Sequence, residues 1–529
     1  MAFYFASSIF VGLVGLLLYT VLFVGHRGRS YPPGPPTLPL VGNVHQIPKT
    51  GAHFKFSEWA RTYGGLFSLK LGPGNAIVLT DRRLVRELVD KKSAIYSDRP
   101  TSYILQQLVT QGHYMLLMDY NSEWRKFRKL IAQQFTESMC EKEHVKLINA
   151  EATQMMRDLV VEPENYMLHP RRFSNSIVMS VLYGIRTPTV RTAHMEKLYE
   201  MLKHFQGVTE FGALPPVDFY PVLKYIPERF FGNWKSRATM VHGKMIGLYA
   251  DLVNTVRQRR KEHGSKNSLM DRVLDSQEKL GLNEHQVCFI GGVALDGGSD
   301  TSGVVILSFM KAMTCFPDIQ RKAQAEIDGL INADRSPAWS DYQSLPYISG
   351  VVKESMRWRP VGGLVPPHAT SEDDWIDGKF IPKGTIVLIN AWGLHQEEKY
   401  YPEPDKFDPA RYTGRTLLAP EYAASADYDS RDHYIYGAGR RLCPGIHLAE
   451  RNLFIAMAKL LWAFSFEKKI DDNGRVMEPD TNYATGWDEG LVTCTKDFPC
   501  RVVPRSPERV ETIMREFAQA KADVLSKYD

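Results

Sequence analysis

One cysteine of this chain stands in a setting suited to chemistry. The stretch "HYIYGAGRRLCPGIHLAER", residues 433–451, places Cys443 among glycines and arginines, just before a helical pattern. Pro444 suits the first position of a helix because its missing N–H is not needed there. Free N–H groups and the dipole at a helix N-terminus stabilise negative charge, so the sequence predicts a thiolate at Cys443.

The neighbours of Cys443 suit a flat, anionic ligand. Gly437, Gly439 and Gly445 have no Cβ, so the backbone can pass close to a flat group. Arg441 offers a planar fork that fits a carboxylate. A sulfur ligand, a close-approach loop and a carboxylate clamp together indicate haem held by a cysteine thiolate.

The residues around the cysteine also match a known pattern. Tyr436, Gly439, Arg441, Cys443 and Gly445 follow the spacing of the haem-binding signature Phe-x-x-Gly-x-Arg-x-Cys-x-Gly, so the chain resembles the cytochrome P-450 monooxygenases. The resemblance implies haem b as cofactor, Cys443 as the axial ligand of its iron, and the other four residues as part of its binding loop. Tyr436 replaces the usual phenylalanine, and its hydroxyl needs a hydrogen-bond partner or water. This difference bears on the iron potential rather than on haem binding.

A polar stretch, "ALDGGSDTSGVV", interrupts an apolar helical pattern at residues 287–310. Taken alone, it fits a tolerated Gly/Ser kink. It is also similar to the family's Gly-x-Asp/Glu-Thr element. The resemblance implies that the glycines open the helix for dioxygen. It also implies that Thr301 donates a hydrogen bond to the bound oxygen and that Asp300 relays protons. Asp296, one turn earlier, is expected to face a polar group of the substrate or to pair with a basic residue outside, and the second reading is favoured.

Three further residues are typical of the family's structural triad. Glu354 and Arg357, at i and i+3, share one face of a predicted helix in "VVKESMRWRP". Arg411 lies in "PDKFDPARY", which matches the family's Pro-x-x-Phe-x-Pro-x-Arg stretch. The resemblance implies a buried Glu–Arg–Arg triad that locks the fold behind the cysteine loop.

Four residues are candidates to bind the haem propionates. Trp124 and Arg128, at i and i+4 in "EWRKFRK", can point at one propionate. The resemblance adds His368, in "VPPHAT", and Arg441 as further propionate contacts. Each residue alone is more often found in a core or on a surface.

The N-terminus predicts a membrane anchor. Residues 3–24 carry no charge and are long enough to cross about 30 Å of hydrocarbon as a helix. His26, Arg27 and Arg29 follow, so the positive-inside rule leaves the rest of the chain in the cytosol. The alternative interpretation is a cleaved signal peptide, but the apolar segment lacks a basic start and a clear cleavage site, and it is too long.

The remaining pattern predicts one large, mainly α body with a minor β region, the cytochrome P-450 fold behind an N-terminal transmembrane helix. Helical spacing dominates residues 81–330, strand-like runs lie at 66–80 and 363–390, and a helix is expected at about 444–464. The division of the chain is then anchor 1–25, basic stop and proline-rich hinge 26–43, haem domain 44–505 and charged helical tail 506–529.

Composition limits the partners. The net charge is only +5 in 529 residues and no basic run forms a nucleic-acid footprint. Six cysteines without zinc-like spacing indicate free thiols in a reducing compartment. Lys126, Lys129 and Arg440 form either a solvated face or a docking patch for the acidic NADPH–cytochrome P-450 reductase of the endoplasmic reticulum membrane, which the resemblance favours.

The expected function follows from the resemblance. It is hydroxylation or epoxidation of a lipophilic small molecule with O₂ and reductase-supplied electrons. The long insert "TLLAPEYAASADYDS" is similar to the fungal branch, so a terpenoid, polyketide or alkaloid intermediate of secondary metabolism is expected. A haem-thiolate isomerase or dehydratase that works without O₂ stays open, as does a non-catalytic haem sensor.

Overall fold

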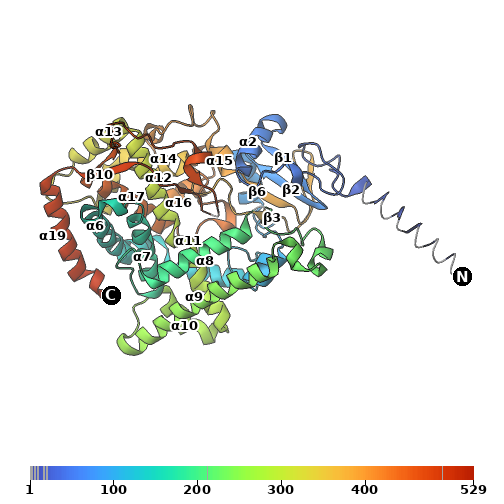
Figure 1. Ribbon diagram of the computed structural model, residues 1–529, viewed down its shortest axis with the longest axis horizontal. Coiled ribbons are helices and arrows are strands. Elements are labelled where there is room, and N and C mark those ends of the chain that lie inside the picture. Colours follow the sequence, from blue (N-terminus) through green and yellow to red (C-terminus); the bar gives the residue numbers. More distant parts are fainter. Residues whose placement is uncertain are drawn as a thin grey trace.

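The computed structural model describes residues 22–210, 212–490 and 492–529, and before them residues 4, 8, 11, 12, 14, 15, 18 and 19. This part of the chain is mainly helical with a small β region, which confirms the predicted mainly α body with a minor β region. Figure 1 shows the main sheet near the N-terminal segment and helix α19 (Pro507–Asp523) at the opposite end of the molecule.

The predicted anchor, residues 3–24, lies mostly outside the described residues. Among the residues that are described, no single helix has the length and apolar composition needed to cross a membrane. One helix pair meets that test by length and composition only, Glu284–Cys315 with Pro317–Asp328, and it is bent by 107°.

Four short strands form the main sheet, in the order β1-β2-β6-β3. β1 and β2 form an antiparallel hairpin, β6 runs parallel to β2, and β3 runs antiparallel to β6. His368 is the first residue of β3 and pairs with Val387 of β6, so the sheet fixes the position of this predicted site residue. The strands are β1 Leu66–Leu71, β2 Gly74–Leu79, β3 His368–Ala369, β4 Asp374–Ile376, β5 Lys379–Ile381, β6 Ile386–Ile389, β7 Phe464–Lys468, β8 Trp487–Asp488, β9 Cys494–Thr495 and β10 Cys500–Pro504.

Helices make up most of the body, and their apolar faces meet in one large core. The longer ones are α2 Ala52–Tyr63, α4 Ser122–Gln134, α6 Val145–Val161, α7 His169–Tyr183, α8 Ala193–Thr209, α9 Trp234–His263, α10 Leu269–Leu280, α11 Glu284–Ser299, α12 Thr301–Cys315, α13 Pro317–Asp328, α14 Pro346–Trp358, α17 Ile446–Ala463 and α19. The short ones are α3 Arg82–Leu84, α5 Glu137–Met139, α15 Ala391–His395, α16 Ala419–Ala424 and α18 Tyr483–Gly486.

Helices α12 and α17 form the centre of the core. They are buried on nearly all sides, as expected of helices that are apolar all round. α12 packs against α7, α14 and α17, so the elements that carry the oxygen-site motif, the triad and the cysteine loop lie next to one another. The core therefore fixes the relative positions of motifs that are far apart in the sequence.

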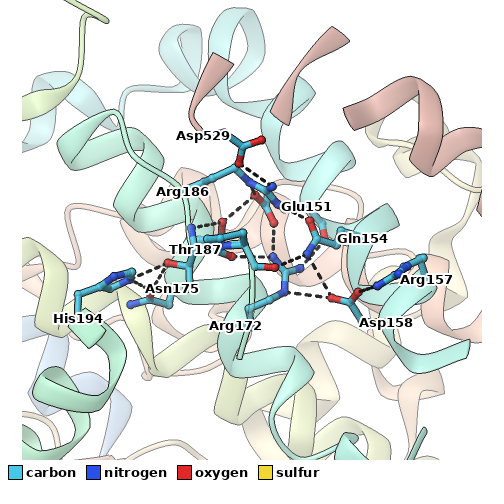
Figure 2. A network of polar contacts seen from close by, with 12 residues as sticks. Glu151, Gln154, Arg157, Asp158, Arg172, Asn175, Arg186, Thr187, His194 and Asp529 are labelled. Carbon is cyan, nitrogen blue, oxygen red and sulfur yellow. Dashed lines mark hydrogen bonds and ion pairs between the residues drawn. The ribbon is translucent and has the colours of Figure 1, made fainter. Parts of the chain in front are cut away.

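A buried polar network ties α6 and α7 to the loop that follows α7 (Figure 2). Glu151 and Arg172 are fully buried and form an ion pair, and Arg186 donates from Nε to Glu151 Oε1 at 3.1 Å. Arg186 also pairs with Asp529 at 3.1 Å, which attaches the end of the described chain to this network. Leu525, just before it, is fully buried. The predicted charged surface helix is thus packed on one side and anchored at its end.

Candidate haem-binding active site

The cysteine loop lies between two turns of fixed geometry. Cys443 follows a short 3-10 turn, Gly439–Arg441, and precedes α17, whose N-cap is Gly445. The backbone N–H of Cys443 donates to the carbonyl oxygen of Tyr436 at 2.9 Å. α17 begins at Ile446 rather than at Pro444, so the predicted helix start is two residues early.

Opposing effects act on the Cys443 thiol. Burial raises its pKa, while the backbone N–H of Gly445 and the guanidinium of Arg128 lower it. The predicted donors at the helix start are therefore present, but they do not outweigh desolvation in the protein alone. A positive charge at the sulfur would favour the thiolate, because a bound cation is the largest local charge in such a site.

The chain's own packing requires a glycine at position 439. It has φ +60°, and a Cβ at this position would lie 2.2 Å from the carbonyl oxygen of Val89. Its N–H donates to Asp90 Oδ1 at 2.8 Å. Close packing on the chain's own backbone therefore requires glycine here.

Three guanidinium groups surround the loop, Arg99 buried and Arg128 and Arg441 partly buried, and none of them forms an ion pair in the part of the chain that the structure describes. Arg441 donates to the carbonyl oxygens of Ser97, Met115 and Met118, and its guanidinium lies 4.4 Å from the Trp124 ring. Arg128 donates to the carbonyl oxygen of Leu442. Arg99 donates to the carbonyl oxygens of Leu116, Pro366 and Pro367.

The electrostatics of these groups are unfavourable as they stand. Burial lowers the pKa of Arg441 to about 10 and that of Arg99 to about 9. Arg441 also lowers the pKa of Arg99, and Arg128 lowers that of Arg441, which Asp98 and Asp119 raise. A bound dianion would remove this repulsion, since buried charges need partners.

His368 has an unused ring nitrogen that points to the same conclusion. Nδ1 lies 2.7 Å from the carbonyl oxygen of Tyr96, which can only accept, so Nδ1 carries the hydrogen. Nε2 is buried and has no hydrogen-bond partner among the described residues. Burial and the neighbouring Arg99 lower the pKa of His368 to about 3. Nε2 of the neutral ring is an acceptor, so it can bind a carboxylate only as the second donor of a protonated ring, and a carboxylate placed there would raise the pKa of His368 and favour that form.

These residues fit a flat group that carries two carboxylates and a metal for a sulfur ligand. The structure brings together four predicted residues, Trp124, Arg128, Arg441 and Cys443, around one loop, and adds Arg99, which the sequence reading missed. Arg99 stands next to Asp98, whose carbonyl oxygen accepts from Ala369 N in β3 at 2.8 Å, so the Arg99 segment runs beside His368. No local spacing marks it, because its partners are far along the chain.

The oxygen-site motif lies at a break between two helices. α11 ends at Ser299 and α12 begins at Thr301, with Asp300 between them, whereas the sequence predicts one helix with an opening. The Thr301 hydroxyl donates to the carbonyl oxygen of Gly297 at 2.9 Å, and a Cβ added at Gly297 would meet no other atom within 4 Å. The glycine thus leaves open space beside Thr301.

Asp300 points to a polar cluster on α7 and α8. Its Oδ1 lies 3.4 Å from Arg171 Nε and accepts from the Tyr199 hydroxyl at 3.4 Å. Burial raises the pKa of Asp300, and Arg171 and Tyr199 lower it. Arg171 also donates to Cys494 Sγ at 3.1 Å. Sequence reasoning did not find Arg171, because 129 residues separate it from Asp300 and no motif includes it.

Asp296 contradicts the favoured expectation of a basic partner outside. It is buried, and its Oδ2 accepts from the hydroxyls of Tyr114, at 3.0 Å, and Tyr249. Burial raises its pKa to about 7. The carboxyl therefore joins α11 to the loop before α4 and to α9.

The Glu354–Arg357–Arg411 group is assembled behind the loop. Glu354 and Arg357 are fully buried and share two hydrogen bonds, of 2.7 and 2.8 Å. Arg411 Nε lies 3.4 Å from Glu354 Oε1, and the N–H of Asp408 donates to the same oxygen at 2.8 Å. The carboxylate thus holds α14 to the segment around Arg411.

Comparisons with known proteins agree with this geometry. A family model described as cytochrome P-450 matches residues 32–485. The cytochrome P-450 monooxygenase macC of Penicillium terrestre is 51% identical over 533 residues, covering 100% of this chain and 99% of its own. The cytochrome P-450 monooxygenase yanC of Aspergillus niger is 51% identical over 522 residues, covering 98% and 97%. A zebra fish cytochrome P-450 solved with progesterone has a TM-score of 0.68 at 23% identity, covering 86% of this chain and 99% of that one. The chain therefore belongs to the cytochrome P-450 family, whose oxidoreductases incorporate oxygen, and it is a monooxygenase of that family.

Proposed function

We propose that this chain is a membrane-anchored haem b monooxygenase that hydroxylates or epoxidises a lipophilic intermediate of fungal secondary metabolism. The observation that carries the proposal is the setting of Cys443, a sulfur near one buried and two partly buried guanidinium groups that form no ion pair with the described carboxylates. Haem b has the sulfur-binding metal and the two carboxylates that this setting lacks.

The chain's residues have separate tasks in this proposal. Cys443 binds the iron, and Trp124, Arg128, His368 and Arg441 hold the propionates. When bound, the haem supplies the activation of dioxygen, and the protein supplies position and charge. The Arg–carboxylate contacts are of the strong, charge-assisted type.

Proton delivery is assigned to Asp300 and Thr301. The Thr301 hydroxyl donates to the carbonyl oxygen of Gly297, next to the open space that this glycine leaves. At this position the hydroxyl can pass on a proton. Asp300 lies next to it in sequence and is linked to Arg171 and Tyr199, so it can take up a proton from that cluster. Retention of both residues favours O₂ chemistry over rearrangement without O₂.

Exposed apolar side chains support the proposed membrane location. Val222, Tyr225 and Phe230 are 65%, 87% and 65% exposed, and Leu40, in the proline-rich segment, is 42% exposed. The hydroxyl of Tyr220 donates to the carbonyl oxygen of Leu40, so the two segments lie together. Grouped exposed apolar residues are typical of a membrane or protein contact.

A lipophilic substrate and a reductase partner complete the proposal. Relatives about half identical to this chain come from Penicillium terrestre and Aspergillus niger, and a structural relative is solved with progesterone. The reductase of the endoplasmic reticulum membrane would dock on the basic side chains of Lys126, Lys129 and Arg440. NADPH-dependent substrate oxidation by membranes that contain both proteins tests this part.

The central test is the absorbance spectrum of the membrane-bound protein, reduced with dithionite, before and after carbon monoxide. We expect a Soret band shifted far to the red, lost in Cys443→Ala and kept in Cys315→Ala. Cys315 is a matched control because it is also a free, partly exposed cysteine. Folded protein without a haem band would refute the proposal.

A further inference from the structure

A small internal cavity lies behind the cysteine loop. It has a volume of about 20 Å³ and is lined by Tyr436, Glu450, Lys353, Ser349, Tyr342 and Ala419, among others. A cavity needs roughly 10–15 Å³ of such volume to hold one water molecule, and the water needs two to four polar partners. The room and the polar lining are both present here.

Glu450 and Tyr436 are among the side chains at the cavity with unused hydrogen-bonding capacity. Glu450 is buried, its Oε1 accepts from the N–H of Ala419 at 2.7 Å, and its Oε2 has no hydrogen-bond partner among the described residues. Arg451 lies 4.0 Å from Oε2, beyond hydrogen-bond distance. In the described chain, the Tyr436 hydroxyl has one hydrogen-bond contact, the weak acceptor Met356 Sδ at 3.8 Å. An unmet buried carboxylate oxygen is costly, so it indicates a partner.

A third side chain can complete the set. The Lys353 ammonium donates to Asp432 at 2.6 Å and to the carbonyl oxygen of Leu417 at 3.5 Å. An ammonium has three donors, so one remains. Both Leu417 and Ala419 belong to the long insert before the cysteine loop, so this insert forms one wall of the cavity.

We propose that the cavity holds one water molecule that bridges the Tyr436 hydroxyl and Glu450 Oε2 and thereby fixes Tyr436 beside the haem-ligating cysteine. Tyr436 is the residue whose carbonyl oxygen accepts from the N–H of Cys443 at 2.9 Å. A water that restrains the Tyr436 side chain therefore also restrains the Tyr436 carbonyl group, which orients Cys443. Tyr436 and Glu450 are positioning residues in this scheme, and the water explains how tyrosine replaces phenylalanine at this position.

The first test is a crystal structure of the full-length, haem-loaded protein. We expect a density peak within hydrogen-bond distance of both Tyr436 Oη and Glu450 Oε2, and its loss or displacement in Tyr436→Phe. An empty cavity, or a water that does not contact Tyr436 Oη, would overturn the proposal. This result can be read whatever substrate the enzyme takes.

The second test is kinetic and separates the water from simple packing. Tyr436→Phe and Glu450→Gln should each speed the loss of the thiolate-type Soret band of the reduced, CO-bound protein in mild urea, by about three- to tenfold. The double variant should be no faster than the faster single variant, because both remove the same bridge. Tyr428→Phe, in the same insert, and Glu511→Gln, on exposed α19, should leave the rate unchanged.

The outcomes stay distinct. Independent, multiplying effects of the two substitutions would show that Tyr436 and Glu450 act separately and would refute the bridge. If Glu450→Gln does not load haem, Tyr436→Phe and the crystal structure still decide. A wild-type protein without the thiolate-type band would instead refute the proposed function.

Discussion

Replacing Glu151 with glutamine should strongly destabilise the fold. Glu151 is fully buried, and its two oxygens accept from Arg172, from Arg186 at 3.1 Å and from Ser176 at 2.7 Å (Figure 2). A glutamine keeps the shape but loses the charge, and its NH₂ group must face donors on one side. The guanidinium groups of Arg172 and Arg186 would then lose the buried carboxylate that balances their positive charges.

The expected cost is about 3–5 kcal/mol, the range for breaking a buried ion pair by removing one partner. The lower end is expected, because Asp158 lies 3.4 Å from Arg172 Nε and Asp529 pairs with Arg186, so part of the charge remains balanced. The desolvation of Arg172, which is fully buried, is not relieved by either partner.

The assay is urea unfolding followed by far-ultraviolet circular dichroism. Glu162→Gln is the matched control, because Glu162 is an exposed residue at the end of the same helix, and it should change stability by less than about 0.5 kcal/mol. Glu151→Leu combined with Arg172→Met should recover much of the loss, because apolar pairs often replace buried ion pairs without cost. An unfolding midpoint for Glu151→Gln equal to that of the control would refute the reasoning.

Three other substitutions have defined outcomes. Thr301→Ala removes the hydroxyl that donates to the carbonyl oxygen of Gly297, so the ratio of product formed to NADPH consumed should fall at least about tenfold. An unchanged ratio would show that another group delivers the proton. Arg171→Met removes the cation that lowers the pKa of Asp300, so the rising limb of the pH–activity profile should move to higher pH, and an unmoved profile would contradict the pairing. Asp296→Asn tests the pKa of Asp296, which burial raises to about 7. Between about pH 4 and pH 7 the unfolded chain releases this proton, while the folded chain keeps it. The free energy of unfolding of the wild type should therefore fall as the pH rises, by on the order of 4 kcal/mol. The asparagine variant should lose that slope in melting temperatures measured across this range, and a wild-type slope in the variant would argue against it.

Residues that act through short spacings could be predicted from the sequence. Glu354 and Arg357 are three positions apart on one helix, and the helix geometry alone makes them neighbours. The loop from Tyr436 to Gly445 is similar, because its chemistry is contained in ten residues and its turns depend on local glycines. The helical content and the two strand regions also follow from local periodicity.

Contacts between distant segments could not be predicted in this way. Arg99 contacts Pro366 and Pro367, and Arg171 contacts Asp300, because helices and strands pack in a particular order that no local pattern encodes. Asp296 was misjudged for the same reason. One carboxylate on a helix face has many possible partners, and the two tyrosines that bind it come from segments about 180 and 47 residues away.

The cofactor site can nevertheless be recognised from the protein's own charges. Arg172 and Arg357, two fully buried guanidinium groups elsewhere in the described chain, are matched by a carboxylate within 3 Å, whereas the buried Arg82 has carbonyl and hydroxyl partners. Around the cysteine loop, Arg99 and Arg441 donate to backbone carbonyl oxygens instead, and Arg441 lowers the pKa of Arg99. Asp98 and Asp119 raise the pKa of Arg441 without forming an ion pair with it, so a bound anion would still offset the desolvation of Arg99 and Arg441. Arginines that have no ion-pair partner among the described residues, next to a free cysteine, therefore fit an anionic group, in agreement with the haem that the family implies.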